Sequence, residues 1–400
     1  MSATAIAHGM DGQLVKPDWA PLTRAEVRAL LRQFPGCEEP IEILNVSPRP
    51  FSAASVVATR SSRVFVKRHH RSVRDRDGLL EEHRFLAHLL AHGAAVPQVL
   101  ANKTGETATE MGEWTYEVHE APQGVDLYGE ALSWTPFQTA EHARSAGQAM
   151  ARMHLASEEF DAPPRKAQPL VASFTIFAAQ DAGEAMDGYV NACPVLHGNA
   201  MVHGCCNDAL DLLAPFHAEL RPLLAALKPL WTHNDLHASN LLWGDAGDNA
   251  QVAAVIDFGL ADRTNAVHDL AQAIERNIVE WLALERQDTE IRDQGSETVP
   301  LHLDHLIAML EGYESVKKLS DEEAAALAPM TALCHAEFAL SETEYFLGVL
   351  HSEEKARMAC DGWLVGHARW FRDAAGNKLL GAIRQWADQR IRRNEKVLRP

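Results

Sequence analysis

The middle of this sequence constrains the fold most strongly, because two polar motifs flank a short strand–turn–strand pattern there. The run His233-Asn234-Asp235-Leu236-His237-Ala238-Ser239-Asn240 has the spacing H-x-D-x-x-x-x-N, and Asp257-Phe258-Gly259 follows it. Between them, residues 241–243 and 252–256 are short β-rich runs on either side of a polar turn at residues 244–249. A hairpin brings its two ends side by side, so the pattern predicts that both motifs meet at one point of the fold.

The residue types of these motifs suit the transfer of a γ-phosphoryl group, which needs an oriented nucleophile and neutralised phosphate charge. Asp235 can accept the hydrogen bond of a substrate hydroxyl and take its proton. Asn240 and Asp257 offer the oxygen ligands that Mg²⁺ prefers when it bridges the phosphates of ATP. The alternative is a structural hairpin capped by Asp and Asn, and the addition of His233 and the D-F-G triplet argues against it.

A kinase site also needs a lysine on a strand and a glutamate on the next helix, and both occur upstream. Lys67 ends the β-rich run 63–67, where its ammonium would reach the α- and β-phosphates. Glu82 lies early in the helix predicted for residues 78–92 and is our choice for the partner of Lys67, one turn before Leu86. A solvated basic patch around Lys67 is the alternative, and the downstream motifs favour the functional interpretation.

The length of 400 residues exceeds what one hydrophobic core usually serves, so two lobes are expected. Residues 1–22 lack apolar periodicity and are predicted to be a flexible lead-in. Residues 23–118 are predicted to form a small β-rich N-lobe with one long helix, and residues 119–124 an interlobe linker. Residues 125–400 are predicted to form a larger, mainly α-helical C-lobe. The predicted fold class is therefore α+β.

Hydrophobic periodicity and turn residues give the individual elements. A capping box formed by Thr23 and Glu26 opens a helix that ends before Pro35-Gly36. The predicted strands of the first lobe span residues 41–46, 55–59, 63–67, 98–101 and 114–119. The predicted helices of the second lobe span residues 140–156, 207–227, 266–285, 301–313, 321–350 and 356–397.

The chain resembles the aminoglycoside phosphotransferase superfamily over about residues 25–370, including its choline-kinase and homoserine-kinase-like branches. The resemblance rests on the two polar motifs, on residues 146–154 and on Asp269-Leu270-Ala271. It implies a bilobal protein-kinase-like fold, with ATP and Mg²⁺ as cofactors. A further stretch, residues 311–323, is similar to the homoserine-kinase and stress-response-kinase branch. The substrates of that branch range from small amino alcohols to protein Ser and Thr.

The resemblance also implies roles for single residues. His233 and Asp269 belong to the catalytic machinery, and Asp269 is expected to brace the catalytic loop. His154 is expected to pack rather than to act as a base.

The segment expected to cover the phosphates departs from the protein-kinase pattern. Residues 47–55 contain no glycine, where protein kinases carry G-x-G-x-x-G. The small residues Ser52 and Ser55 are our choice for contacts with phosphate. The linker resembles that of the family, which places backbone groups of Glu120 and Ala121 at the adenine.

The formal net charge is −18, and the acidic excess lies after residue 118. This charge argues against nucleic acid and anionic lipid as partners, and is compatible with a neutral or cationic acceptor. Asp262 and the pair Glu280-Trp281 are places where a cation would meet a carboxylate or a ring, unless they are a turn aspartate and an interface tryptophan. The tail residues Trp363, His367, Trp370 and Phe371 are expected to pack on the second lobe and to wall the acceptor pocket.

The six cysteines, the lack of a secretory leader and the lack of a long apolar run predict a cytoplasmic protein with reduced thiols. Together these features predict a phosphotransferase that moves the γ-phosphate of ATP to a hydroxyl of a small molecule, which is aminoglycoside-like, choline-like or homoserine-like. A Ser/Thr protein kinase and a non-catalytic ATP-binding module of the same fold are the alternatives.

Overall fold

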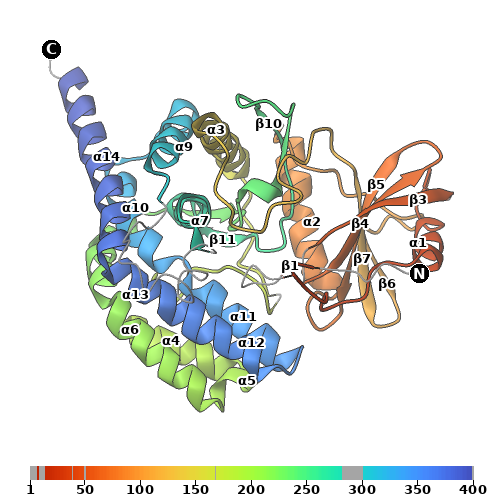
Figure 1. Cartoon of the computed structure of the whole chain (residues 1–400), viewed down its shortest axis with the longest axis horizontal. Helices are drawn as coiled ribbons and strands as arrows, with labels where there is room; N and C mark the ends of the chain where they lie inside the picture. The colour runs from red at the N-terminus through yellow and green to blue at the C-terminus, as the bar shows by residue number, and fades with distance from the viewer. Residues whose placement is uncertain are drawn as a thin grey trace.

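The structure, a computed structural model, describes residues 7–8, 14–37, 39–48, 51–166, 168–281 and 301–398. A smaller β-rich N-lobe and a larger α-helical C-lobe lie side by side (Figure 1). The predicted α+β class is therefore confirmed. Among the helices described, none is both long and apolar enough to cross a membrane.

The N-lobe is built on a five-stranded antiparallel sheet with the strand order β3-β4-β5-β7-β6. Its strands are β3 (Pro40–Val46), β4 (Ala53–Thr59), β5 (Arg63–His70), β6 (Ala108–Met111) and β7 (Trp114–Glu120), and the short pair β1 (Ala7–His8) and β2 (Leu14–Val15) precedes them. Helix α1 (Arg24–Leu31) packs on an apolar face that includes Val57 and Val66. Helix α2 (Arg76–Ala91) contacts the other face, where His83 meets Glu117 of β7.

The predicted capping box begins α1 as expected. The Thr23 hydroxyl accepts from the Glu26 N–H, and the Glu26 carboxylate accepts from the Thr23 N–H, both over 3.2 Å. The same carboxylate accepts hydrogen bonds from Arg68 and Tyr116 of the sheet. Glu26, which takes part in the capping box, therefore also anchors α1 to the sheet.

Residues 98–101, predicted as a strand, do not form one. Val99 makes a single bridge to His119, and the Leu100 N–H donates to the Val118 carbonyl over 2.8 Å. The first half of the same edge of β7 is already paired with β6, which the sequence did not predict. The segment thus lies beside the expected strand, but too little free edge remains for a regular ladder.

The C-lobe is mainly helical around one large apolar core. Its helices are α3 (Ala140–Ser157), α4 (Ala182–Ala192), α5 (Pro194–His197), α6 (Ala200–Leu220), α7 (Ala266–Ile278), α9 (Leu303–Val316), α10 (Asp321–Leu333), α11 (Ala336–Gly348), α12 (Glu353–Arg357), α13 (His367–Arg372) and α14 (Ala374–Leu398). A π-helical segment, Met358–Gly366, joins α12 to α13, and a 3₁₀ turn, Arg221–Ala226, follows α6. Two antiparallel pairs complete the lobe, β8 (Pro229–Thr232) with β11 (Asp262–Asn265), and β9 (Leu241–Trp243) with β10 (Val252–Val255).

Two of the predicted long helices are broken. The helix predicted for residues 321–350 splits into α10 and α11, because α10 packs on α7 and α14 whereas α11 packs on α12 and the π-helical segment. The helix predicted for residues 356–397 divides in the same way into the π-helical segment, α13 and α14. The last part of the helix predicted for residues 266–285 lies outside the described residues.

Residues 16–22 are in contact with both lobes, in contrast to the flexible lead-in that we predicted. Trp19 stacks on His70 of β5 with ring centroids 5.1 Å apart. Asp18 forms an ion pair of 2.6 Å with Lys355 of α12. A segment this short has no hydrophobic periodicity, so the sequence pattern could not show that residues 16–22 connect the two lobes.

Helices α3 and α9 approach so closely that each presents a glycine to the backbone of the other. A Cβ atom built on Gly147 would lie 2.1 Å from the Met309 carbonyl oxygen, and one built on Gly312 would lie 2.1 Å from the Arg144 carbonyl oxygen. Neither contact can be relieved by turning a side chain, because both partners are backbone. These two glycines therefore set the distance between the helices.

We expect Gly147→Ala to lower the free energy of unfolding by about 2 kcal/mol or more, because the added methyl group must push the helices apart. The matched control is Gly188→Ala on exposed helix α4, where an added Cβ meets nothing within 4 Å. That control should stabilise the protein by about 0.5–1 kcal/mol through helix propensity. Urea unfolding measures both, and a similar change in the two variants would contradict the close packing.

Candidate active site

The β9–β10 hairpin brings the two polar motifs together, as the sequence predicts. The Ile256 N–H donates to the Asn240 carbonyl over 2.9 Å, so the residue before β9 lies beside the residue after β10. Asp257 follows directly and has a left-handed backbone with φ of 61°. This uncommon conformation for a residue with a side chain turns the chain sharply at the end of the hairpin.

Asp235 and Asn240 face each other across the loop between β8 and β9. The Asn240 amide nitrogen donates to the Asp235 backbone carbonyl over 2.9 Å and to its carboxylate over 3.1 Å. Within the described residues, no hydrogen bond uses the amide oxygen of Asn240. That oxygen is therefore available as a metal ligand, which is the role predicted for it.

Lys67 and Asp257 join the two lobes at the site. The Lys67 ammonium lies 2.8 Å from the Asp257 carboxylate. Burial tends to raise the pKa of Asp257, but Lys67 outweighs it and lowers the pKa to about 2. Burial tends to lower the pKa of Lys67, but the carboxylates of Asp257, Glu117 and Glu82 raise it above its ordinary value. Both groups are therefore charged at neutral pH.

The ion pair that we predicted between Lys67 and Glu82 is not formed. Glu82 lies 3.6 Å from the Arg165 guanidinium, and Lys67 pairs with Asp257 instead. The buried Arg165 also donates to the carbonyls of Gly259 and Ala261, so it occupies the space between α2 and the Asp257 loop. The sequence contains no local signal for this arginine, which lies in a loop without periodicity.

Asp269, at the start of α7, holds the catalytic loop from behind. Its carboxylate accepts the N–H groups of His233 and Asn234 over 3.1 and 2.7 Å, and also contacts His154 over 2.9 Å. The second ring nitrogen of His154 is 2.9 Å from the Tyr313 hydroxyl. Asp269 and His154 are fully buried, so both position the loop and do not touch a substrate.

His233 likewise contacts the loop itself, and its assignment to the catalytic machinery stays a prediction. Its Nε2 lies 3.0 Å from the Ile256 carbonyl, and its Nδ1 accepts the Asp235 N–H over 3.1 Å. Both ring nitrogens are therefore used by backbone on either side of the hairpin. The residue ties the loop of Asp235 to the strand that ends before Asp257.

Arg276 of α7 is a site residue that we did not predict. Its guanidinium pairs with the Asp235 carboxylate and donates to the Asn234 carbonyl over 2.9 Å. Burial raises the pKa of Asp235 above its usual range, and Arg276 opposes that rise. A signal existed, because Asp269, Gln272 and Arg276 recur on one face of the predicted helix.

Two neighbouring residues of the segment predicted to contact phosphate, Ala54 and Ser55, lie on opposite faces of the sheet. Ala54 pairs with Lys67 across β4 and β5, whereas Ser55 pairs with Val66. Because directly opposed residues share a face, Ser55 points to the α1 core and away from Lys67, so its prediction is wrong. Ser52 lies in the loop before β4 and stays a prediction.

The loop before β4 also touches the C-lobe. Phe51 packs edge-on against Tyr345 of α11, with ring centroids 5.3 Å apart. This aromatic contact joins the start of the segment before β4 to the C-lobe.

The linker residues predicted at the adenine already use their N–H groups. The Glu120 N–H donates to the Gln98 carbonyl over 2.9 Å, and the Ala121 N–H donates to the Arg63 carbonyl over 3.2 Å. Neither can donate to a base in this conformation. A contact with adenine would have to use their carbonyl oxygens.

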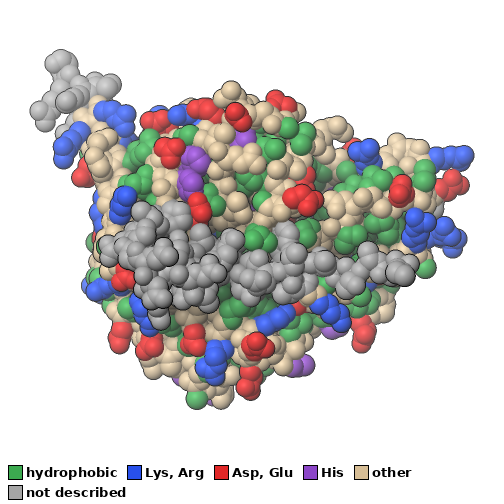
Figure 2. All heavy atoms as spheres, in the orientation of Figure 1, with side chains coloured by type: hydrophobic (Ala, Val, Ile, Leu, Met, Phe, Trp, Pro, Cys, Tyr) green, Lys and Arg blue, Asp and Glu red, His purple; other side chains and the backbone are tan. Residues whose placement is uncertain are grey.

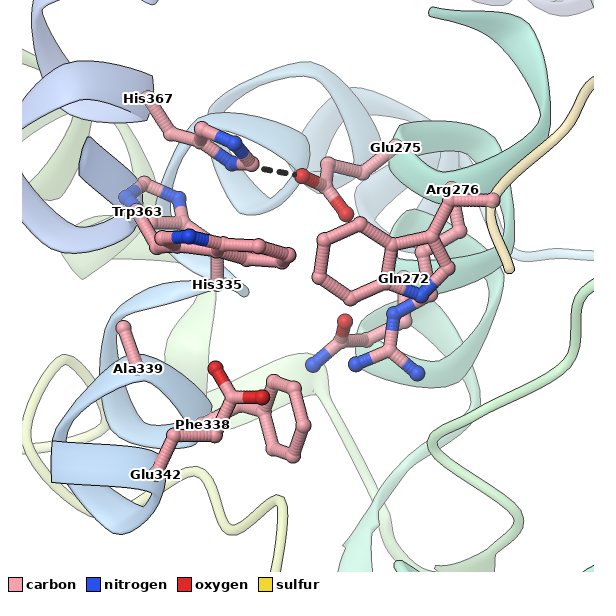
Figure 3. A pocket seen from close by; sticks show the side chains of 10 residues that line it. Gln272, Glu275, Arg276, His335, Phe338, Ala339, Glu342, Trp363 and His367 are labelled. Carbon is pink, nitrogen blue, oxygen red and sulfur yellow. Dashed lines mark ion pairs between the residues drawn. The ribbon is translucent and has the colours of Figure 1, made fainter. Parts of the chain in front are cut away.

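A small cavity lies beside Arg276, between α7, α11 and the π-helical segment. Its volume of about 10 Å³ has room for one water-sized group. Figure 3 shows the Glu342 carboxylate and the Arg276 guanidinium directed toward the same space. Trp363 and His367 of the aromatic tail also line it. The sequence did not single out Glu342, which stands in the polar run Ser341-Glu342-Thr343-Glu344 of α11.

The charged residues that we considered for cation binding have other partners. Asp262 is buried and accepts from the backbone of Arg165 and from the Ser173 hydroxyl. Glu280 lies 2.7 Å from His302, and Trp281 stacks on His367 with ring centroids 3.7 Å apart. Acidic and basic side chains are interspersed on the face in Figure 2, so the net charge forms no single acidic patch there. The structural interpretation holds for Asp262.

A cleft between a β-sheet lobe and a helical lobe, with a lysine on one side and loop carboxylates on the other, defines a protein-kinase-like phosphotransferase. The model of the phosphotransferase enzyme family, APH, matches residues 51–305. The chain belongs to this family, and it is a kinase that acts on an alcohol group.

Solved structures of the same fold are only distantly related in sequence. An amicoumacin kinase in complex with AMP-PNP, Ca²⁺ and Ami is 12% identical, with a TM-score of 0.54 over 87% of this chain and 94% of that chain. A microcompartment-associated aminopropanol kinase is 16% identical, with a TM-score of 0.54 over 89% of this chain and 100% of that chain. At such identities the likeness shows the fold. No protein of curated function matches the sequence.

We expect Asp269→Asn to lower the turnover rate about 10- to 100-fold while leaving nucleotide affinity nearly unchanged. The loop that carries Asp235 would lose the charge that holds it, whereas the pair of Lys67 and Asp257 would stay intact. Steady-state kinetics and nucleotide titration measure the two effects. Asp304→Asn, an exposed carboxylate on α9, is the control, and an Asp269→Asn enzyme with full turnover would show that the brace is dispensable.

Proposed function

We propose that this protein transfers the γ-phosphate of ATP to a hydroxyl of a small, amine-bearing alcohol, with Asp235 as the catalytic base. The observation that carries the proposal is the meeting of Lys67, Asp235, Asn240 and Asp257 in one cleft, from three separate segments of the chain. Membership of the phosphotransferase family supports the reaction class.

The residues of the cleft fit a nucleotide and a divalent metal ion. Asp257 is ionised, its side chain is 39% exposed, and it follows Ile256, whose N–H donates to the backbone carbonyl of Asn240. The Asp257 carboxylate and the Asn240 amide oxygen would hold Mg²⁺, which when bound neutralises the phosphate charge. Lys67 would leave part of its contact with Asp257 to meet the phosphates. The amicoumacin kinase of the same fold is described with AMP-PNP and Ca²⁺, in keeping with this assignment.

Asp235 is placed to act on the acceptor hydroxyl. As the hydroxyl oxygen bonds to the γ-phosphorus and the bond to ADP breaks, the carboxylate takes the hydroxyl proton. Asn240 keeps one carboxylate oxygen in place over 3.1 Å, and Arg276 holds the other. Arg276 therefore orients the base on the side of the small cavity.

The cavity favours an acceptor that carries an amine. Glu342 is 1% exposed, and its Oε2 has no hydrogen-bond partner among the described residues. A buried carboxylate without a partner is costly, and burial raises the pKa of Glu342 well above its usual range. An ammonium group in the cavity would supply the missing donor and charge. Aminopropanol, named for one structure of this fold, is an alcohol of this kind.

We expect Asp235→Asn to retain ATP binding and to lose turnover by about 100-fold or more, because the proton acceptor is gone. Asp257→Ala should instead lose Mg²⁺-dependent ATP binding. ATP consumption with aminoglycosides, choline, ethanolamine, homoserine and aminopropanol, beside ATP titration, separates the two effects. Asp248→Asn in the exposed hairpin turn is the matched control. Full activity of both site variants would refute the proposal, and phosphate on a protein substrate instead of a metabolite would make the enzyme a protein kinase.

We expect Glu342→Gln to raise KM for an amine-bearing acceptor about 10-fold or more, with little change for the matching amine-free alcohol. The reason is that the amide keeps the shape of the side chain but cannot carry the charge. Glu344→Gln lies on the same helix outside the cavity and serves as the control. A KM that rises equally for both acceptors would rule out recognition of the amine by Glu342.

A further inference from the structure

Three histidines surround one glutamate on the α2 face of the N-lobe sheet, and the proposed reaction uses none of them. His69 Nε2 lies 3.0 Å from one oxygen of the Glu117 carboxylate. His83 Nε2 and His119 Nε2 lie 3.0 and 2.7 Å from its other oxygen. All four side chains are buried, with exposed fractions between 1% and 7%. Such a concentration of imidazole around a carboxylate in a buried place calls for an explanation.

Three different elements deliver this cluster to one point. Glu117 and His119 alternate along β7 and therefore share a face, and His83 reaches them from α2. The ligand atoms of His83, Glu117 and His119 all lie within 4.8 Å of one another. Around a tetrahedral ion with bonds of about 2.0–2.1 Å, ligand atoms are about 3.3 Å apart. Small ring movements would therefore bring all three to bonding distance.

We propose that His83, His119 and Glu117 bind a Zn²⁺ ion that ties α2 to the sheet of the N-lobe. Two imidazoles and a carboxylate are a common zinc set, which leaves a fourth position for water. Nitrogen ligands also distinguish this site from the proposed Mg²⁺ site, where Asn240 and Asp257 would supply oxygen ligands.

The surroundings of the cluster provide the support that zinc ligands usually have. His83 Nδ1 lies 2.9 Å from the Thr107 hydroxyl, and His69 bonds to the carboxylate oxygen that the other two histidines leave free. When His83 donates its Nδ1–H to Thr107, its Nε2 carries a lone pair toward the centre of the cluster. A metal ion accepts that lone pair, whereas the carboxylate alone would repel it.

The charge around the site is balanced enough to accept a dication. Lys67 is close, since Glu117 pairs with it directly across β5 and β7. The carboxylates of Glu82 and Asp257 also act on Lys67 and offset its charge. The consequence of binding is mainly structural, because an ion held only by the folded chain stabilises it by mass action.

The test is equilibrium dialysis of the full-length chain against Zn²⁺ after EDTA treatment, with excess Mg²⁺ present and no nucleotide. We expect one Zn²⁺ per chain, a rise in melting temperature on zinc addition, and a visible d–d spectrum when Co²⁺ is the probe. Zinc binding that does not exceed trace amounts would overturn the proposal. Because no ATP is present, that result would leave the proposed phosphotransfer untouched.

Variants locate the ion. His119→Gln and His83→Gln should abolish stoichiometric zinc binding, whereas His92→Gln, exposed at the C-cap of the helix that carries His83, should keep it. Thr107→Val removes only the outer partner and is expected to weaken binding about 10- to 100-fold without disturbing the core. It serves as the decisive variant if a buried substitution impairs folding. Undiminished zinc binding in Thr107→Val together with either histidine variant would place the ion elsewhere and refute the site.

Discussion

The buried carboxylate of Asp269 holds in place the loop that carries Asp235. Asp269 accepts two consecutive N–H groups, from His233 and Asn234, at the point where Asn234 has a left-handed φ of 59°. A buried charge is tolerated only when its hydrogen bonds are satisfied, so the loop cannot leave Asp269 without a large cost. His154 is the third hydrogen-bond partner of the Asp269 carboxylate, and its other ring nitrogen contacts the Tyr313 hydroxyl of α9. The loop that carries Asp235 is thus held by the close-packed pair α3 and α9, deep in the C-lobe.

The sequence was informative where chemistry is local and uninformative where it depends on distant contacts. Asp235, Asn240 and Asp257 were predictable, because a hairpin with a recognisable turn brings its own ends together. The prediction for Ser55 failed because of the strand register, since a shift of one residue along β4 moves a side chain to the other face of the sheet. The partner of Lys67 was mistaken for the related reason that Arg165, far along the chain, takes Glu82. A local sequence pattern cannot show which residue from a distant part of the chain forms the ion pair.

The small cavity beside Arg276 could not be predicted from the sequence either, because its residues come from elements that are distant in the chain. Its charges also bear on the specificity of the proposed reaction. Arg276 and Glu342 stand on α7 and α11, and α9 and α10 lie between them in the described chain. Each looks like an ordinary charged residue of an amphipathic helix until the fold places both at one small cavity. Arg276 contacts Asp235 directly and also acts on Glu342 across the cavity, so the two carboxyl groups share one electrostatic environment. Under the proposed function, an amine bound beside Glu342 would change the charge around Asp235 without any movement of the loop.

The π-helical segment has a consequence for the shape of the small cavity. Trp363 lines the cavity from within Met358–Gly366, where the winding is wider than in an α-helix. A π-helical turn accommodates one more residue than an α-helical turn, and helical winding continues on either side of it. The width of this one segment therefore sets where Trp363 meets the cavity, whereas Asp269 and the loop that it supports belong to other elements.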